Sequence, residues 1–253
     1  MPKLPVDNSF LDLSDYGRPL GKAIANSLKS TGITPIHVTI WFILAGLIAV
    51  LFILTGHYWL AALFLIIKSI LDAADGELAR VKQTPSYTGR YFDSIADILL
   101  NFIILIAICH ITDGNILLAL LAFISIQFQG TLYNYYYVIL RNKYHGDETS
   151  RIFENETPLA MPREEQKTVD FLFTIYKILY GLFDKSIYVL DPNAPQGHAF
   201  PNWLMTIVST MGLGFQLLLI SIMLVSGLAH YIVPFFIFYS LAVLVLIAIR
   251  KLL

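Results

Sequence analysis

The chain has 253 residues, of which 57 % are hydrophobic and 14 % are charged, and its formal net charge at pH 7 is −1. Soluble domains contain about 45–50 % apolar and about 25 % charged residues. This composition excludes a soluble enzyme, a disordered chain and a basic nucleic-acid-binding protein, so no nucleic-acid partner is expected. The single cysteine, Cys109, lies in an apolar run and supports neither a disulfide framework nor a thiolate metal site. Long apolar runs predict an all-α, multi-span membrane protein.

The first segment, residues 1–36, is predicted to lie in the cytoplasm and to contain a short amphipathic helix. Leu20, Ile24 and Leu28 would share one face of this helix, and its lysines would face anionic lipid headgroups. The helix is therefore predicted to lie in the membrane interface. A plain cytosolic extension is the alternative.

Residues 37–253 are predicted to form one domain that crosses the membrane six times. Each apolar segment is near or above the roughly 20 residues that cross a bilayer core. The predicted spans are 38–55, a segment from Tyr58 into the charged sequence 68–80, a segment from Thr88 to just before Asp113, 114–140, 202–225 and 229–249. An even number of spans places both termini on the same side.

Two features near the end of the fourth predicted span have more than one interpretation. The tyrosine-rich run 132–137 fits an interfacial aromatic belt or a lining for a headgroup or a cytidine ring. Residues 141–200 are predicted to form a cytoplasmic loop. Its aromatic part, 168–190, fits an interfacial helix, a continuation of the fourth span or a re-entrant segment.

The basic residues are distributed very unevenly around the predicted spans. All but one of the 17 Lys and Arg residues precede the first span, follow the last, or lie in the loops after the second and fourth spans. The positive-inside rule therefore predicts that both termini and the two longer loops face the cytoplasm. The exception, Lys68, lies one helical turn before Asp72 and is expected to pair with it or to extend to the headgroups.

Residues 72–97, DAADGELARVKQTPSYTGRYFDSIAD, contain four aspartates at the cytoplasmic edge of the second and third spans. Asp72 and Asp75 share one helix face, and Asp93 and Asp97 are i, i+4 neighbours. Because these spans are antiparallel and joined by a short loop, the four carboxylates are expected to meet. Such a group needs cations near a bilayer, and all-oxygen ligands favour Mg²⁺ or Mn²⁺. Two ions would suit a pyrophosphate ligand.

Two other interpretations of these carboxylates are possible. They could cap helix ends and pair with nearby Lys and Arg residues. They could also form the cation or proton site of an ion transporter, but such a site predicts carboxylates near mid-membrane and repeated halves. The four aspartates lie at the membrane edge, and no internal repeat is evident.

The pattern Asp72-x2-Asp75-Gly76-x2-Ala79-Arg80-x8-Gly89-x3-Asp93-x3-Asp97 resembles the signature of the CDP-alcohol phosphotransferase (phosphatidyltransferase) family at all eight fixed positions. The resemblance implies a metal-dependent membrane transferase that moves a phospho-alcohol group from a CDP-alcohol to an acceptor hydroxyl and releases CMP. It implies that the ligands of two metal ions are Asp72, Asp75, Asp93 and Asp97. It implies that Asp97 is also the general base. The CDP group would be bound by Asp72, Gly76, Ala79, Arg80 and Gly89. A homodimer is also implied.

The resemblance leaves two classes of donor. One is CDP-diacylglycerol, or an archaeal ether equivalent, with a small polar alcohol as acceptor. The other is CDP-choline or CDP-ethanolamine with diacylglycerol as acceptor. The short six-span chain is more similar to the first group. The sequence after Asp97, ILLNFIIL, lacks the patterns of phosphatidylserine synthases and of glycerophosphate enzymes, which disfavours those two acceptors.

Overall fold

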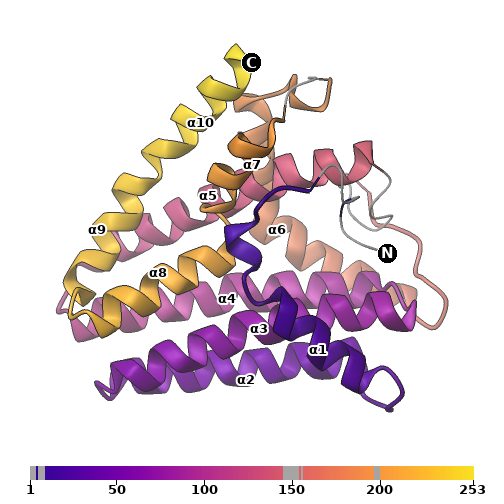
Figure 1. Cartoon of the computed structure of the whole chain (residues 1–253), viewed down its shortest axis with the longest axis horizontal. Coiled ribbons are helices and arrows are strands. Elements are labelled where there is room, and N and C mark those ends of the chain that lie inside the picture. Colours follow the sequence, from indigo (N-terminus) through magenta and orange to yellow (C-terminus); the bar gives the residue numbers. More distant parts are fainter. Residues whose placement is uncertain (1–3, 5–8, 145–153, 155, 197–199) are drawn as a thin grey trace.

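The computed structural model describes the chain except residues 1–3, 5–8, 145–153, 155 and 197–199 (Figure 1). The described residues form helices and no strands, which confirms the predicted all-α class. In chain order the elements are η2 (Leu13–Asp15), α1 (Arg18–Leu28), α2 (Pro35–Leu54), α3 (Tyr58–Lys82), α4 (Tyr87–Ile111), α5 (Ile116–Lys143), α6 (Gln166–Leu190), η3 (Ala194–Gln196), α7 (Asn202–Ser209), α8 (Leu213–Val225), α9 (Ala229–Tyr239) and α10 (Leu241–Leu252).

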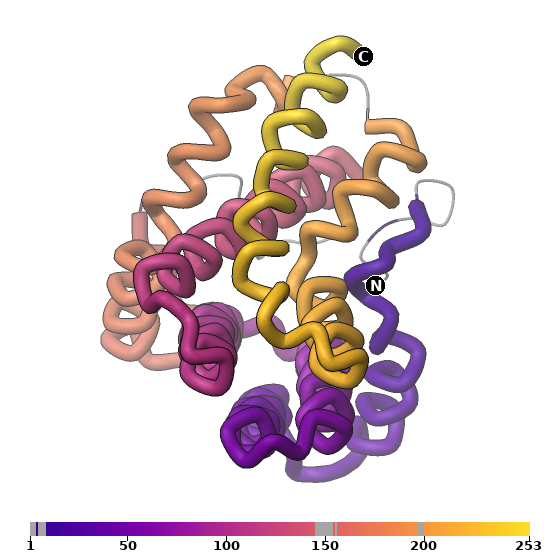
Figure 2. Tube along the Cα trace, turned by 90° about the vertical axis from the view of Figure 1, so that its left-hand side faces the viewer, coloured from indigo at the N-terminus to yellow at the C-terminus, as the bar shows by residue number. Residues whose placement is uncertain are grey.

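The lower layer in Figure 1 consists of α2, α3 and α4, which run roughly parallel to the long axis of the molecule. Helix α3 packs against α1, α2 and α8, so protein surrounds much of it. Helices α5, α9 and α10 rise away from this layer, and Figure 2 shows α6, α7 and α10 on the side opposite α2. The main apolar core lies where α2, α3, α4, α5, α8 and α9 meet.

By length and composition, four helices in the described part of the chain are able to cross a membrane: α2, α4, α5 and the continuous pair α9–α10. The pair α7–α8 is bent by 50° and is a fifth if it forms one span. The number is below the predicted six because of α3. This helix is 25 residues long, but Lys68, Asp72 and Asp75 lie within it. The apolar helices indicate an integral membrane protein.

The predicted span 202–225 is broken between α7 and α8. The N-terminal segment lies against this break: an added Cβ at Gly212 would be 2.3 Å from Ser14 Oγ. An added Cβ at Gly214 would be only 1.9 Å from the carbonyl oxygen of Ser14. The Gly214 N–H donates a hydrogen bond to Ser14 Oγ at 3.1 Å. The two glycines therefore allow the backbone of residues 13–15 to approach α8.

The short N-terminal helix is present as α1, and part of the predicted apolar face packs inward, because Ile24 and Leu28 are partly buried against the cluster that contains Ala74 of α3. Gly21 and Ala25 are buried, and an added Cβ at Gly21 would lie 3.0 Å from the backbone nitrogen of Ala74 on α3. Leu20, in contrast, is 57 % exposed. Small residues thus bring α1 against α3 and leave Leu20 on the outer surface.

The loop predicted at 141–200 contains a separate helix, α6, which packs against α4 and α5 and does not continue α5. The tyrosine-rich run at the end of α5 forms a packed core. Tyr136 is fully buried and donates to Asp191 Oδ2 at 2.7 Å, and Tyr135 donates to the Asp191 carbonyl at 3.0 Å. Arg250 of α10 pairs with the same aspartate. These two tyrosines hold the end of α6 and the C-terminal helix against α5, and neither forms an aromatic belt.

Candidate functional site

The four aspartates lie on two consecutive antiparallel helices. Asp72 and Asp75 belong to the C-terminal half of α3, and Asp93 and Asp97 belong to the N-terminal half of α4. A short turn joins the helices. Gln83 ends α3 in the left-handed region, with φ of 53°, and Ser86 caps α4 by accepting a hydrogen bond from the Gly89 N–H at 2.8 Å. Because this connection is short, the two pairs of carboxylates lie at a similar height along the axes of α3 and α4.

Three of the four carboxylates form one compact group. One oxygen from each of Asp72, Asp75 and Asp93 lies within 4.8 Å of the others. Asp75 is buried and accepts a hydrogen bond of 2.8 Å from Thr39 Oγ1 on α2. Asp93 Oδ1 is buried and has no hydrogen-bond partner among the described residues. An all-oxygen group with one unpaired acceptor fits a hard divalent cation such as Mg²⁺ or Mn²⁺.

Asp97 is not part of this group within the described chain, and it pairs with Lys68 instead. The Lys68 side chain is fully buried, with its Nζ 3.8 Å from Asp72 Oδ2 and 4.7 Å from the centroid of the Phe42 ring. The lysine therefore does not extend to lipid headgroups. It faces both the expected partner, Asp72, and a second carboxylate on the neighbouring helix.

The remaining signature residues lie on the same two helix ends and are half-buried. Gly76, Ala79 and Arg80 follow Asp75 on α3, and Gly89 precedes Asp93 on α4. An added Cβ at Gly76 would be in ordinary van der Waals contact with the Arg80 guanidinium, at 3.4 Å, so the guanidinium lies next to this glycine. All eight signature positions therefore lie in the C-terminal half of α3 or the N-terminal half of α4.

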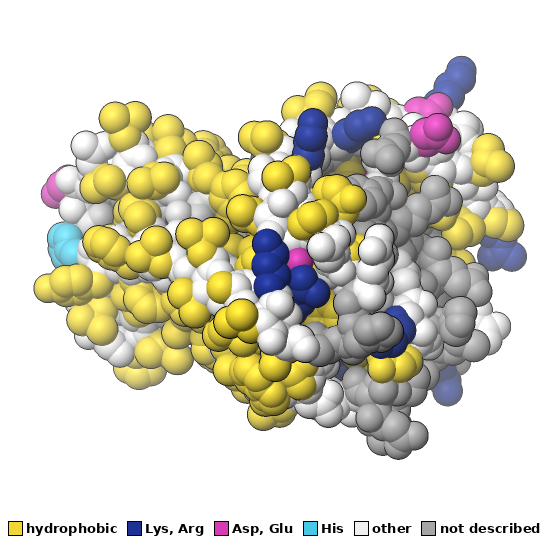
Figure 3. Space-filling view, turned by 90° about the horizontal axis from the view of Figure 1, so that it is seen from above, with side chains coloured by type: hydrophobic (Ala, Val, Ile, Leu, Met, Phe, Trp, Pro, Cys, Tyr) yellow, Lys and Arg dark blue, Asp and Glu magenta, His cyan; other side chains and the backbone are white. Residues whose placement is uncertain are grey.

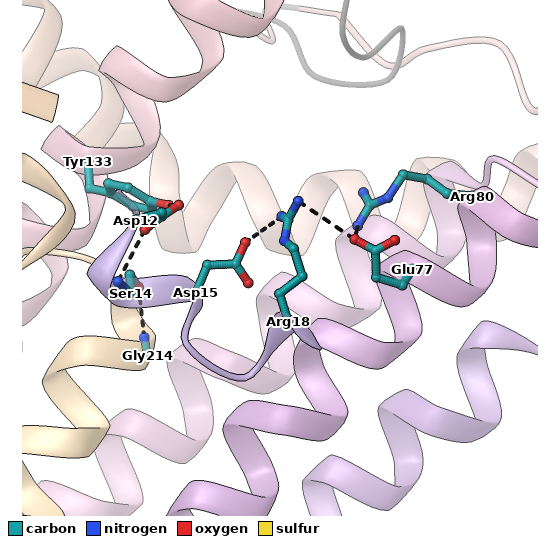
Figure 4. A network of polar contacts seen from close by, with 8 residues as sticks. All are labelled: Asp12, Ser14, Asp15, Arg18, Glu77, Arg80, Tyr133 and Gly214. Atoms are coloured by element: carbon teal, nitrogen blue, oxygen red, sulfur yellow. Dashed lines mark hydrogen bonds and ion pairs between the residues drawn. The ribbon is translucent and has the colours of Figure 1, made fainter. Parts of the chain in front are cut away.

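Arg80 is held by an ion-pair network that reaches the N-terminal segment (Figure 4). Arg80 Nη2 lies 3.0 Å from Glu77 Oε1, and Arg18 Nη1 of α1 lies 3.7 Å from the same oxygen. Arg18 also pairs with Asp15. Helix α1 is thus linked through Glu77 to the arginine that the sequence pattern assigns to the CDP group.

The N-terminus of α4 receives a second cap from a residue far away in the sequence. Glu164 accepts hydrogen bonds from Ser86 Oγ and the Thr88 N–H, both at 2.7 Å, and from the Met161 N–H at 2.9 Å. Burial opposes ionisation of the Glu164 carboxyl, but these hydrogen bonds outweigh it and lower its pKa. The segment before α6 is thereby attached to the helix that carries Asp93 and Asp97.

Three contacts of the site were not anticipated from the sequence: Thr39 with Asp75, Lys68 with Asp97, and Glu164 with the start of α4. Each joins residues from different elements. For the contact of Thr39 with Asp75, the available signal in the sequence was a hydroxyl near the start of a largely apolar helix. Nothing local marks Glu164 as a cap for a helix 76 residues earlier.

Charge is distributed unequally along the long axis. The turns α2–α3, α4–α5 and α8–α9 gather at the left end of Figure 1, and none of them contains Lys or Arg. From above, that end is covered mainly by hydrophobic side chains, whereas the Lys and Arg side chains lie toward the other end (Figure 3). The carboxylates of α3 and α4 lie in the helix halves farther from these turns.

A family model described as CDP-alcohol phosphatidyltransferase matches residues 32–208. No curated protein sequence matches the chain. The matched range begins just before α2, ends in α7 and includes all eight signature residues.

Proposed function

Because the chain belongs to the CDP-alcohol phosphatidyltransferase family, we propose that it transfers the phosphatidyl group of CDP-diacylglycerol to the hydroxyl of a small polar alcohol, with release of CMP. Family membership supports the transfer of a phospho-alcohol group from a CDP-alcohol, and thus a role in phospholipid synthesis. CDP-diacylglycerol is the first of the two donor classes that the family resemblance leaves. The observation that carries the proposal is the meeting of three carboxylates, with Asp97 beside them, at the junction of α3 and α4.

In this proposal Asp72, Asp75 and Asp93 hold Mg²⁺ or Mn²⁺. The compact all-oxygen group and the unpaired Asp93 Oδ1 support this assignment. The sequence pattern adds Asp97 as a fourth ligand and implies two ions. When bound, such ions neutralise negative charge on the phosphates of the donor.

Asp97 is proposed as the general base. It would take the proton of the acceptor hydroxyl while the hydroxyl oxygen bonds to the phosphorus that carries diacylglycerol. The bond from that phosphorus to the bridging oxygen breaks, and CMP leaves with the electron pair. Arg80 would hold the CDP phosphates, because a guanidinium binds phosphate oxygens in pairs. Asp72, Gly76, Ala79 and Gly89 would complete the CDP site.

The proposed domain, residues 37–253, crosses the membrane six times, with α3 as the second span. The other spans are α2, α4, α5, α7–α8 and α9–α10. The distribution of basic residues supports cytoplasmic termini and an active site open to the cytoplasm. Residues 1–36 would remain cytoplasmic, with α1 at the interface. A homodimer is proposed from the family resemblance.

Helix α6 is proposed to lie in the membrane interface. Its outer face carries an apolar stripe of Phe171, Ile178, Leu182 and Val189, each 64–74 % exposed. Its opposite face packs on α4 and α5 and includes buried Val169 and Phe173. A helix that is apolar outside and also bears charged residues suits the headgroup boundary.

The test is CMP release by the purified protein with Mg²⁺ and CDP-diacylglycerol over a panel of polar alcohols, with Asp97→Asn as the control. CMP formed with one acceptor, and lost in the variant, would identify the reaction. Activity only with CDP-choline or CDP-ethanolamine plus diacylglycerol would reverse the roles of donor and acceptor. No CMP from either donor class would contradict the proposal.

A further inference from the structure

The ammonium group of Lys68 contacts Asp97, the carboxylate that the family resemblance makes a ligand of one of two ions. We propose that Lys68 is a positioning residue that replaces that ion, so that the site holds a single divalent ion at Asp72, Asp75 and Asp93. The inference rests on the proposed function and changes the number of ions that the sequence pattern implies.

The first step is the position of Lys68. It is the fourth residue before Asp72 on α3, and its side chain is fully buried. A buried ammonium is strongly unfavourable unless carboxylates surround it, and removal of its partner is costly. Its contacts are Asp97, Asp72 Oδ2 at 3.8 Å and the Phe42 ring. The positive charge is therefore fixed between α3 and α4 by the fold.

The second step is the arrangement of the carboxylates. In two-metal sites the ions lie about 3.5–4 Å apart and share ligands. In the described chain the carboxylates of Asp72, Asp75 and Asp93 lie close enough together to hold one ion. The fourth carboxylate contacts Lys68 through Asp97 Oδ1. A second ion would need Asp97 and would have to lie next to a buried ammonium. Repulsion between these two cations disfavours the second ion.

The third step is the consequence for Asp97. Lys68 Nζ contacts Oδ1 and orients the carboxylate, so Oδ2 would take the proton of the acceptor hydroxyl. Lys68 itself would touch neither substrate nor ion. Its role is to hold Asp97, as a second ion would otherwise do.

The test is Mn²⁺ binding to the purified full-length protein in detergent, measured by equilibrium stoichiometry and by electron paramagnetic resonance. The expected result for the unmodified protein is one Mn²⁺ per chain with the spectrum of an isolated ion. Lys68→Met should bind two ions, with a spectrum broadened by coupling between them. Lys68→Arg, which keeps the cation, should bind one. Two coupled ions in the unmodified protein, or no second ion in folded Lys68→Met, would overturn the inference.

The control is Arg250→Met, which removes another buried cation that pairs with a carboxylate, Asp191, on other helices. It should lose stability and keep one Mn²⁺, which separates a local effect from general destabilisation. If Lys68→Met does not fold, the stoichiometry of the unmodified protein decides alone. CMP release together with two bound ions would reject only the role of Lys68. No CMP and no Mn²⁺ binding would reject the proposed function as well.

Discussion

The four aspartates have different surroundings, which predict different effects of removing each charge. Asp75 is buried within the three-carboxylate group, whereas Asp97 lies outside it and contacts Lys68. Asp97→Asn should abolish turnover, because loss of a general base lowers the rate about 10²-fold or more. The variant should keep much of the CDP-alcohol binding. Asp75→Asn should weaken metal and nucleotide binding together. CMP release and equilibrium binding of a CDP-alcohol measure both effects, and an equal loss of binding in the two variants would contradict the division of roles.

Thr39 is expected to influence the ion without touching it. Its hydroxyl donates to Asp75 Oδ2 at 2.8 Å, and such supporting hydrogen bonds typically contribute about 10–100-fold to metal affinity. Thr39→Val should therefore raise the Mn²⁺ dissociation constant about 10-fold in a titration. Thr39→Ser keeps the hydroxyl and should bind nearly as the unmodified protein does. Equal weakening in both variants would indicate a packing effect instead.

The site residues show what sequence spacing is able to predict. Spacing within one helix placed Lys68 next to Asp72, and this proximity is present at 3.8 Å. The contact between Lys68 and Asp97 joins two helices and depends on how α4 is rotated about its axis. The same holds for Thr39 and Asp75, which come from α2 and α3. Periodicity assigns residues to one face, but packing decides which faces meet.

At the scale of elements, the cap on α4 predicts a dependence on pH. The pKa of Glu164 is lowered in the folded protein. Its stabilising effect is therefore complete above the pKa of the unfolded chain and is lost as the pH falls through the lower folded value. Glu164→Ala should reduce stability at pH 7 by about 1 kcal/mol, as loss of a helix cap does.

Thermal unfolding in detergent at several pH values measures this difference, which should shrink as the pH is lowered into the acid range. The control is Glu165→Ala. Glu165 is the next residue, is exposed and makes no side-chain hydrogen bond at the start of α6. A similar loss of stability in the control, or a difference that does not change with pH, would contradict the assigned role of Glu164.

The contact between the N-terminal segment and α8 predicts the effect of a single methyl group. An added Cβ at Gly214 would overlap the backbone of Ser14 at 1.9 Å, whereas one at Gly130, within α5, meets nothing within 4 Å. Gly214→Ala should lose about 1–3 kcal/mol of stability, as overpacking does. Gly130→Ala should be neutral or gain about 0.5–1 kcal/mol. Unfolding midpoints in detergent test this, and equal behaviour of the two variants would contradict it.

Some elements were easier to predict than others, for a physical reason. The segments 38–55 and 114–140 contain no charged residue and correspond to α2 and α5 within a few residues. The break between α7 and α8 was not predicted, because the residues that lie against it, 13–15, are about 200 positions earlier. Helix α6 was left with several interpretations, since its hydropathy is mixed.

At the scale of the whole molecule, the main question is whether α3 crosses the membrane. A count based on composition omits α3 because of its charged residues. In the folded chain, however, Lys68 is fully buried and Asp75 is only 7 % exposed, because α1, α2 and α8 cover the helix. Charged residues that face protein are compatible with a membrane span, and they usually mark a functional site. This coverage supports the proposed six-span arrangement.

The arrangement predicts which exposed positions lie on the same side of the membrane. With α3 as a span, His57, Asp113 and Ser226 would all lie on the outer side, whereas Pro85 and Lys251 would lie in the cytoplasm. Single cysteines at these exposed positions, in a Cys109→Ser background, should divide into those two groups when sealed vesicles are labelled with a membrane-impermeant maleimide. Cys109 is buried, and its Sγ donates to the Gly114 carbonyl, so serine keeps that hydrogen bond. Labelling of His57→Cys and Pro85→Cys from the same side would show that α3 does not cross, and the carboxylate site would then need another path to the lipid.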